Sequence, residues 1–204
     1  MSNNSAQLYK NAVMEGLWTK IPVFRLMLGL CPTLAVTTGV KSALTMGLSV
    51  IFVLVCSNFV VSLLRNLIKP HLRILIFTLA IAAFVTIADL YLKAFMPVMS
   101  EKLGAYIPLI IVNCIIICRA EECASKCSIG VSIVDGFSMG LGFTIVVCIL
   151  GAIREIISAG TVYGIKFTPA SYIPMVSLAM PVGAFVTLGL LLGLWNTIEM
   201  KKGK

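Results

Sequence analysis

The chain has 204 residues, of which 59% are hydrophobic and only 12% are charged, and its formal net charge is +8. Soluble domains usually carry about 25% charged residues, and the mean hydropathy here is +1.05. This composition excludes an ordinary soluble domain, and a positive balance of this kind is typical of basic membrane loops that face lipid headgroups, so we expect no nucleic-acid partner.

Apolar segments separated by charged loops predict six membrane-spanning helices. In chain order the expected spans are 21–40, 43–64, 72–92, 105–124, 137–157 and 172–196. We therefore expect an all-α integral membrane protein that forms a single domain over residues 1–204. The N-terminus lacks a basic region followed by a short apolar run and a cleavage site, so we expect no cleaved signal peptide.

The distribution of Lys and Arg predicts the orientation of the chain. Of sixteen such residues, eleven would lie on the side that holds the two termini and the loops after the second and fourth spans, and five on the other side. Positive residues stay on the cytoplasmic side, so both termini are expected to be cytoplasmic. His71 lies in the basic loop after the second span and is expected at the membrane interface.

The six spans divide into two sets of three, at about 20–95 and 104–198. An odd number of spans in each half predicts that the halves are inverted repeats of opposite orientation. Spans one and four have the shortest uncharged stretches, 26–40 and 105–118. We expect both helices to be interrupted near the membrane midplane, which is where such paired segments form a binding site.

One cysteine lies near the middle of each interrupted span. Cys31 is flanked by Gly29 and Pro32, and Cys114 follows Asn113. A thiolate in an apolar interior is costly unless a soft metal takes up its charge. An iron–sulfur cluster needs four ligands, of which this chain would give two and a second subunit two more. The alternative is that both cysteines are small packing residues.

A second cysteine set would place a complete site within this chain. Its members have the spacing C-x3-C-x4-C-x3-C and are Cys114, Cys118, Cys123 and Cys127. A straight helix cannot bring all four around one cluster, so the shared site is preferred. Cys56 and Cys148 lie in the middle of long uninterrupted spans and are expected to be packing residues.

No residue is predicted to act as a catalytic acid, base or nucleophile. Asp135 and Glu155 fall near expected span ends, where charged groups anchor or pair at the interface. Arg119 and Glu121 follow the fourth span closely, and with Asp135 they are the candidates for an ion pathway or for orienting the site. The "GLG" at 140–142 has no strand before it and is not a nucleotide-binding loop, so its small residues are expected to allow close helix packing.

Four motifs resemble one family over essentially the whole chain. They are "GLCPTLAVTT" at 29–38, "VNCIIICRAEECASK" at 112–126, "DGFSMGLGF" at 135–143 and "GAIREIISAGTVYG" at 151–164. In order and spacing they are similar to the E-type subunit of the Rnf complex. That family is in turn similar to the D-type subunit of the sodium-pumping NADH:quinone reductase, in which a small residue usually replaces Pro32.

The resemblance implies a membrane subunit of an oxidoreductase that links ferredoxin and NAD and translocates Na⁺ or H⁺ across the prokaryotic inner membrane. It implies a [2Fe–2S] cluster shared with the homologous A-type subunit of opposite topology, with Cys31 and Cys114 as this chain's ligands. Gly29, Pro32 and Asn113 would form the cluster environment. FMN, NAD and the other iron–sulfur clusters would belong to partner subunits, among which those of the B, C, D and G types are expected.

Two other classes of function remain open at this point. In the first, the chain is the D-type subunit of the sodium-pumping NADH:quinone reductase, the other branch that it resembles. A transporter or a scaffold subunit without a cofactor would use the same inverted repeat, and would keep its function after replacement of the cysteines.

Overall fold

The computed structural model describes residues 9–10, 12–14, 16, 23, 25–65, 72–162, 165–166 and 180–202. His71 and the beginning of the expected sixth span, at 172–179, lie outside these residues.

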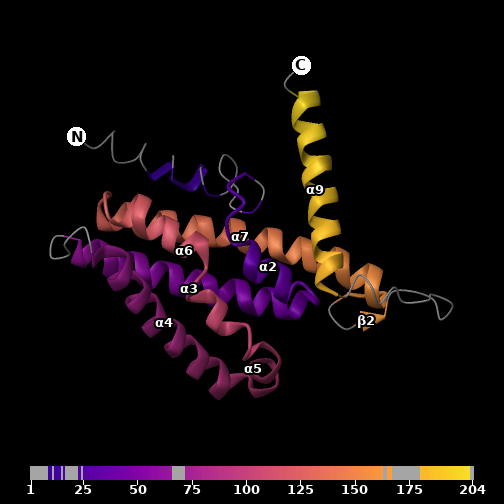
Figure 1. Ribbon diagram of the computed structural model, residues 1–204, viewed down its shortest axis with the longest axis horizontal. Coiled ribbons are helices and arrows are strands. Elements are labelled where there is room, and N and C mark those ends of the chain that lie inside the picture. Colours follow the sequence, from indigo (N-terminus) through magenta and orange to yellow (C-terminus); the bar gives the residue numbers. More distant parts are fainter. Residues whose placement is uncertain are drawn as a thin grey trace.

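Helices dominate the described part of the chain (Figure 1). They are α2 (Leu30–Val36), α3 (Val40–Leu64), α4 (Arg73–Phe95), α5 (Pro97–Leu103), the 3₁₀ turn η3 (Ile107–Ile110), α6 (Cys114–Arg119), the π-helical turn η4 (Ala120–Ala124), α7 (Ile129–Ala159) and α9 (Pro181–Lys202). A short antiparallel ribbon follows α7 and pairs β1 (Thr161–Val162) with β2 (Ile165–Lys166). The all-α prediction therefore holds apart from this ribbon.

In the described part of the chain, four helices are long and apolar enough to cross a membrane, namely α3, α4, α7 and α9. A fifth span is formed if α5 counts together with residues 107–124, which meet it at a bend of 67°. The described residues thus give four or five spans where six were expected. Within the first expected span, the described residues 25–39 form a helix over the seven residues of α2, and turns occupy the positions just before it.

Local signals explain where the long helices end. Pro97 has no backbone N–H and disfavours helical geometry at the residue before it, so α4 stops and α5 begins. Gly160 adopts φ +64° at the end of α7, and its amide donates to the carbonyl of Ile156 at 3.0 Å. This is the left-handed C-terminal cap that glycine favours.

The core is an antiparallel pair made by α3 and α7, which lie side by side along most of their length (Figure 1). Glycines allow the close approach. A Cβ on Gly140 would lie 2.8 Å from the Ile51 side chain, and one on Gly47 would lie 2.5 Å from Thr144. Small residues at helix contacts are typical of membrane proteins, so the sequence-based prediction that Gly140 serves close helix packing is confirmed.

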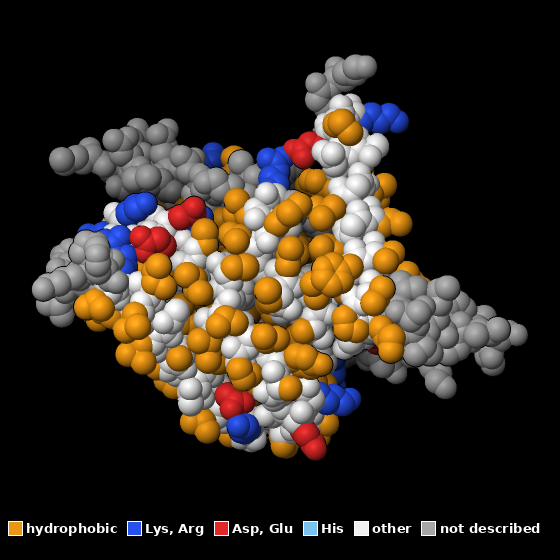
Figure 2. All heavy atoms as spheres, in the orientation of Figure 1, with side chains coloured by type: hydrophobic (Ala, Val, Ile, Leu, Met, Phe, Trp, Pro, Cys, Tyr) orange, Lys and Arg blue, Asp and Glu red, His pale blue; other side chains and the backbone are white. Residues whose placement is uncertain are grey.

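The surface fits a chain embedded in lipid. Exposed apolar side chains cover the outer faces of α4 and α9, among them Leu75, Leu79, Leu90, Phe185, Leu190 and Leu194. In Figure 2, charged side chains gather near the end of α3 and near the junction of α4 with α5, and hydrophobic side chains cover the surface between them. A large contiguous apolar surface is expected only against a membrane or a partner.

The order of elements is similar in the two halves. In each half, a short helix that begins at or next to a cysteine precedes a long helix: α2 precedes α3, and α6 precedes α7. A further long helix follows, α4 in the first half and α9 in the second. The symmetry that would relate the halves, and the domain limits, stay predictions.

Replacing Gly140 with valine tests the α3–α7 contact. The new side chain would meet the Ile51 backbone as well as its side chain, and overpacking of this kind costs about 1–3 kcal/mol. We expect a lower midpoint of thermal unfolding in detergent. Gly189→Val on α9 is the control, because nothing lies within 4 Å of a Cβ at that position. Equal midpoints for the two variants would contradict the assigned contact.

Candidate metal centre

Gly29 is the N-terminal cap of α2 and takes the left-handed conformation with φ +80°. A Cβ at this position would lie 2.9 Å from the Phe143 ring of α7, so glycine is required both by its conformation and by its neighbour. Pro32 falls in the first turn, where backbone N–H groups have no helical acceptor. Pro32 therefore helps α2 to begin beside Cys31.

Helix α6 begins at Cys114, and Asn113 is its N-terminal cap. The backbone of Asn113 is extended, and its Oδ1 accepts a hydrogen bond from the amide of Ile115 at 3.3 Å. Asparagine is among the residues best suited to this position. The chain before it, over η3 and the following turn, is not α-helical, so the expected interruption of the fourth span lies directly before the cysteine.

One hydrogen bond joins these two helix starts. The backbone amide of Gly29 donates to Sγ of Cys114 at 2.9 Å, across 85 positions of sequence. Cys31 lies two residues beyond this amide, in the first turn of α2. The structure thus brings together Gly29, Asn113 and Cys114, which the sequence had assigned to one site.

The residues at this contact fit a sulfur-rich anionic group. Cys114 is half-buried and already receives one N–H donor, and the Nδ2 atom of buried Asn113 has no hydrogen-bond partner among the described residues. Cys31 is exposed on this chain, so its thiol is open to a neighbouring subunit. Two thiols and nearby N–H donors are suited to half of a cluster that needs four thiolates.

The alternative four-cysteine site is not assembled. No group of three or more His, Cys, Asp or Glu side chains able to hold a metal ion occurs in the described part of the chain. Cys118 and Cys127 are half-buried and Cys123 is buried, and the intervening residues form the π-helical turn η4. The four cysteines of this set therefore do not gather around one point in the described structure.

A row of hydrogen-bonded polar side chains, which was not predicted, lies on the inner face of α2. Thr33 Oγ1 donates to the carbonyl of Gly29, and Thr37 Oγ1 donates to that of Thr33, both at 2.7 Å. Arg154 of α7 then donates to Thr37 Oγ1 at 2.6 Å. All three side chains are buried. The i, i+4 spacing of the two threonines was the available signal, since it places both on the face opposite Cys31.

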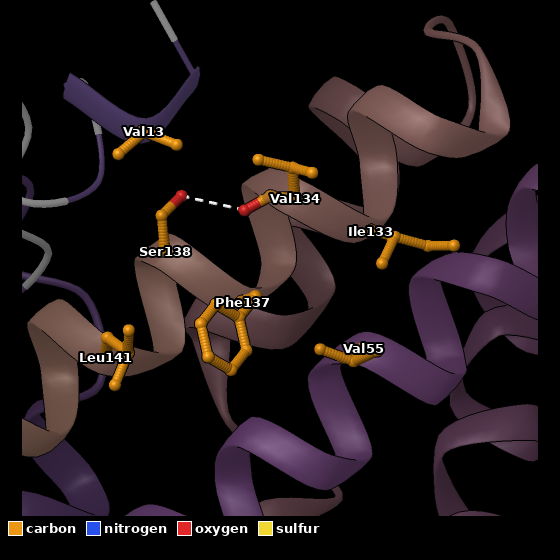
Figure 3. A pocket seen from close by; sticks show the side chains of 7 residues that line it. All are labelled: Val13, Val55, Ile133, Val134, Phe137, Ser138 and Leu141. Carbon is orange, nitrogen blue, oxygen red and sulfur yellow. Dashed lines mark hydrogen bonds between the residues drawn. The ribbon is translucent and has the colours of Figure 1, made fainter. Parts of the chain in front are cut away.

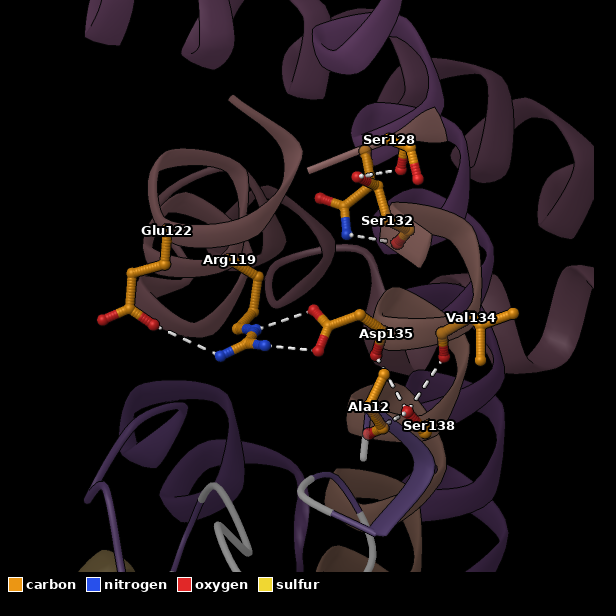
Figure 4. A network of polar contacts seen from close by, with 9 residues as sticks. Ala12, Arg119, Glu122, Ser128, Ser132, Val134, Asp135 and Ser138 are labelled. Carbon is orange, nitrogen blue, oxygen red and sulfur yellow. Dashed lines mark hydrogen bonds and ion pairs between the residues drawn. The ribbon is translucent and has the colours of Figure 1, made fainter. Parts of the chain in front are cut away.

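Arg119 and Asp135 form a buried bidentate ion pair between α6 and α7 (Figure 4). Arg119 Nε donates to Oδ2 at 2.8 Å, Nη2 donates to Oδ1, and Nη1 reaches the exposed Glu122 at 3.2 Å. Asp135 was expected to anchor or pair at a span end, and its partner is Arg119. Because α7 begins at Ile129 rather than at 137, the carboxylate lies within the helix and is buried.

The remaining acidic candidates have other partners. Glu121 pairs with Arg73 at the start of α4, at 3.1 Å. Glu155 was expected at the interface beside Arg154, but it is buried and its Oε2 accepts from the Val40 amide at 2.8 Å. A carboxylate is favourable there because Val40 is the first residue of α3, the positive end of the helix dipole.

An apolar pocket of 310 Å³ lies elsewhere, on the side of α7 that faces Val13 and Val55 (Figure 3). Among the described residues that line it, the hydroxyl belongs to Ser138, which already donates to the carbonyl of Val134 at 2.9 Å. The predicted site residues are not part of this lining.

A model of the family described as "Rnf-Nqr subunit, membrane protein" matches residues 9–192. The chain belongs to the Rnf-Nqr family. The match includes both short helices and both cysteines of the candidate centre, as well as the ion pair that joins α6 to α7.

Several curated relatives match nearly the whole chain. The E-type subunit of the Na(+)-translocating ferredoxin:NAD(+) oxidoreductase complex of Acetobacterium woodii is 48% identical over 89% of this chain and 93% of its own. The counterpart in the proton-translocating complex of Clostridium ljungdahlii is 39% identical over 90% and 86%. The E-type subunit of an ion-translocating oxidoreductase complex of Haemophilus influenzae is 42% identical over 99% and 92%. This Rnf-Nqr chain is thus similar to E-type subunits throughout, as the motifs predicted.

Replacing Asp135 with asparagine tests the buried pair. The change leaves the Arg119 charge without its counter-ion, and breaking a buried pair on one side typically costs about 3–5 kcal/mol. We expect a large loss of thermal stability in detergent, part of which returns in the double variant Arg119→Met/Asp135→Leu. As a control, Asp89→Asn removes the ion-pair partner of Lys93. This pair is more exposed than the pair of Arg119 with Asp135, so its loss should cost about 1 kcal/mol or less. A small effect of Asp135→Asn, similar to that of the control, would contradict the pairing.

Proposed function

We propose that this chain is the E-type membrane subunit of an ion-translocating ferredoxin:NAD oxidoreductase complex, in which it serves electron transfer. Cys31 and Cys114 would supply two of the four thiolates of a [2Fe–2S] cluster, and the homologous A-type subunit of opposite topology would supply the other two. The observation that carries this proposal is the hydrogen bond from the Gly29 amide to Cys114 Sγ, because it unites the starts of two short helices that each present a cysteine.

The names of the relatives support the complex but differ in the ion. One relative is named as Na⁺-translocating and another as proton-translocating, so the proposal covers both ions. The flavin, the NAD site and the other clusters are assigned to partner subunits. We further propose that the complex lies in the prokaryotic cytoplasmic membrane with both termini of this chain on the cytoplasmic side.

The residues of this chain would hold and orient the group. A bound cluster supplies one-electron transfer. Gly29 and Asn113 fix the two helix starts, and the Gly29 amide donates to the ligating sulfur of Cys114, where negative charge concentrates. Cys31 is exposed in the isolated chain, so a second subunit is required to seal its thiol from lipid and water.

We assign Arg119 and Asp135 to orientation of the site and not to ion conduction. Each neutralises the other in a buried bidentate contact, so neither presents an uncompensated charge to a passing cation. The pair fixes α6 against α7, and Cys114 is the first residue of α6. Glu121, in η4 directly after α6, pairs with Arg73 of α4 and so helps to fix the end of α6 that lies away from Cys114.

Electron paramagnetic resonance of the dithionite-reduced complex tests the ligand assignment. We expect one S = 1/2 signal to disappear in Cys31→Ser and in Cys114→Ser, measured as difference spectra against the wild-type complex. Cys148→Ser is the matched control, because this half-buried cysteine lies within the long helix α7 and not in α2 or α6. Unchanged spectra in both ligand variants, with the complex assembled, would leave the cofactor-free transporter or scaffold as the function.

Substituting Gly29 tests the geometry of the helix start. In Gly29→Ala the added Cβ meets Phe143 and the backbone is strained at φ +80°, so the amide moves away from Cys114 and we expect less iron and sulfide bound per complex. Gly39→Ala is the control, since Gly39 has an extended backbone and a Cβ added there would lie 3.8 Å from its nearest neighbour. Equal cluster content in the two variants would contradict the role of Gly29.

A further inference from the structure

The side chain of Asn113 has one polar atom whose role in the chain is unexplained. Asn113 is completely buried, with no exposed surface. Its Oδ1 caps α6 by accepting from the Ile115 amide, but Nδ2 has no partner among the described residues. A buried donor without an acceptor is unfavourable, so we expect a group at this position that accepts a hydrogen bond from Nδ2.

The orientation of the amide follows from the cap. Exchanging the oxygen and nitrogen of Asn113 would set an NH₂ group against the N–H of Ile115, donor against donor. Nδ2 is therefore the atom left over for another acceptor. The NH₂ group of an amide carries two hydrogens and cannot itself accept a hydrogen bond, so the missing partner is an acceptor.

The position of the amide indicates which acceptor. Asn113 precedes Cys114 in the chain, and its Oδ1 lies 3.6 Å from the point that a Cβ on Gly29 would occupy. The Asn113 amide thus lies beside the backbone donor that already contacts Cys114 Sγ. The Gly29 amide contacts Cys114 Sγ, and the side-chain amide of the residue before Cys114 lies next to Gly29.

We propose that Asn113 Nδ2 donates a hydrogen bond to a sulfur of the group held by Cys31 and Cys114, and that this donor sets the reduction potential of that group. The inference rests on the proposed function, since it presupposes the cluster. Reduction by one electron forms and breaks no covalent bond but makes the sulfurs more negative. An N–H donor is then held more strongly in the reduced state, and the potential rises.

The test is a redox titration of the assembled complex, followed through the S = 1/2 signal that depends on Cys31 and Cys114, with dithionite as reductant. Asn113→Gly removes the donor and keeps an acceptable helix cap. Asn113→Asp keeps the shape and the capping oxygen but loses the donor and adds negative charge. We expect the midpoint potential to fall in both, and further in Asn113→Asp. A tenfold loss in the equilibrium constant for reduction corresponds to about 59 mV.

Asn58→Ala is the matched control. Asn58 is equally buried and also has one unpartnered polar atom, Oδ1, but it lies on α3 and donates to the Ser132 carbonyl. Its replacement should leave the midpoint unchanged.

The midpoint potentials and the presence of the signal separate the possible roles of Asn113. A midpoint in Asn113→Gly equal to that of the wild type would overturn the inference, even if Asn113→Asp is lowered by its charge. Loss of the signal in both Asn113 variants would also overturn it, because Asn113 would then retain the cluster and not tune it. A wild-type complex without a signal that depends on Cys31 and Cys114 would instead refute the proposed function.

Discussion

The hydrogen bond between the Gly29 amide and the Cys114 sulfur joins two helix starts that lie 85 residues apart in sequence. Each start depends on a local rule, a left-handed glycine before α2 and an asparagine cap before α6. The contact makes one site out of them, and Phe143 of α7 lies directly against Gly29. Helix α7 therefore adjoins the site at the start of α2.

Helix α7 holds the two short helices through two buried charges. Near its beginning, Asp135 pairs with Arg119 at the end of α6, and near its end, Arg154 donates to Thr37 at the end of α2. Glycine contacts keep α7 close to α3 between these points. Burying charges in a membrane protein is costly and marks functional constraint. Here the charges fix the ends of α2 and α6 that lie away from Cys31 and Cys114.

Much of this arrangement could be predicted from the sequence because its causes are local. Apolar length predicted α3 and α4, and the flanking Gly29, Pro32 and Asn113 marked the interruptions at both cysteines. The partners of buried charges could not be predicted, since Asp135 and Glu155 have no local signal for what they contact. The earlier start of α7 adds residues 129–136, in which Asp135 is the single charged residue, and so brings that carboxylate into the helix.

Single-particle imaging of the assembled complex tests the central claim most directly. The account predicts compact density between the starts of α2 and α6, in contact with the sulfurs of Cys31 and Cys114 and with two sulfurs of an adjoining subunit. Density that ends at the two thiols, with lipid or protein side chains occupying the space beyond them, would contradict it.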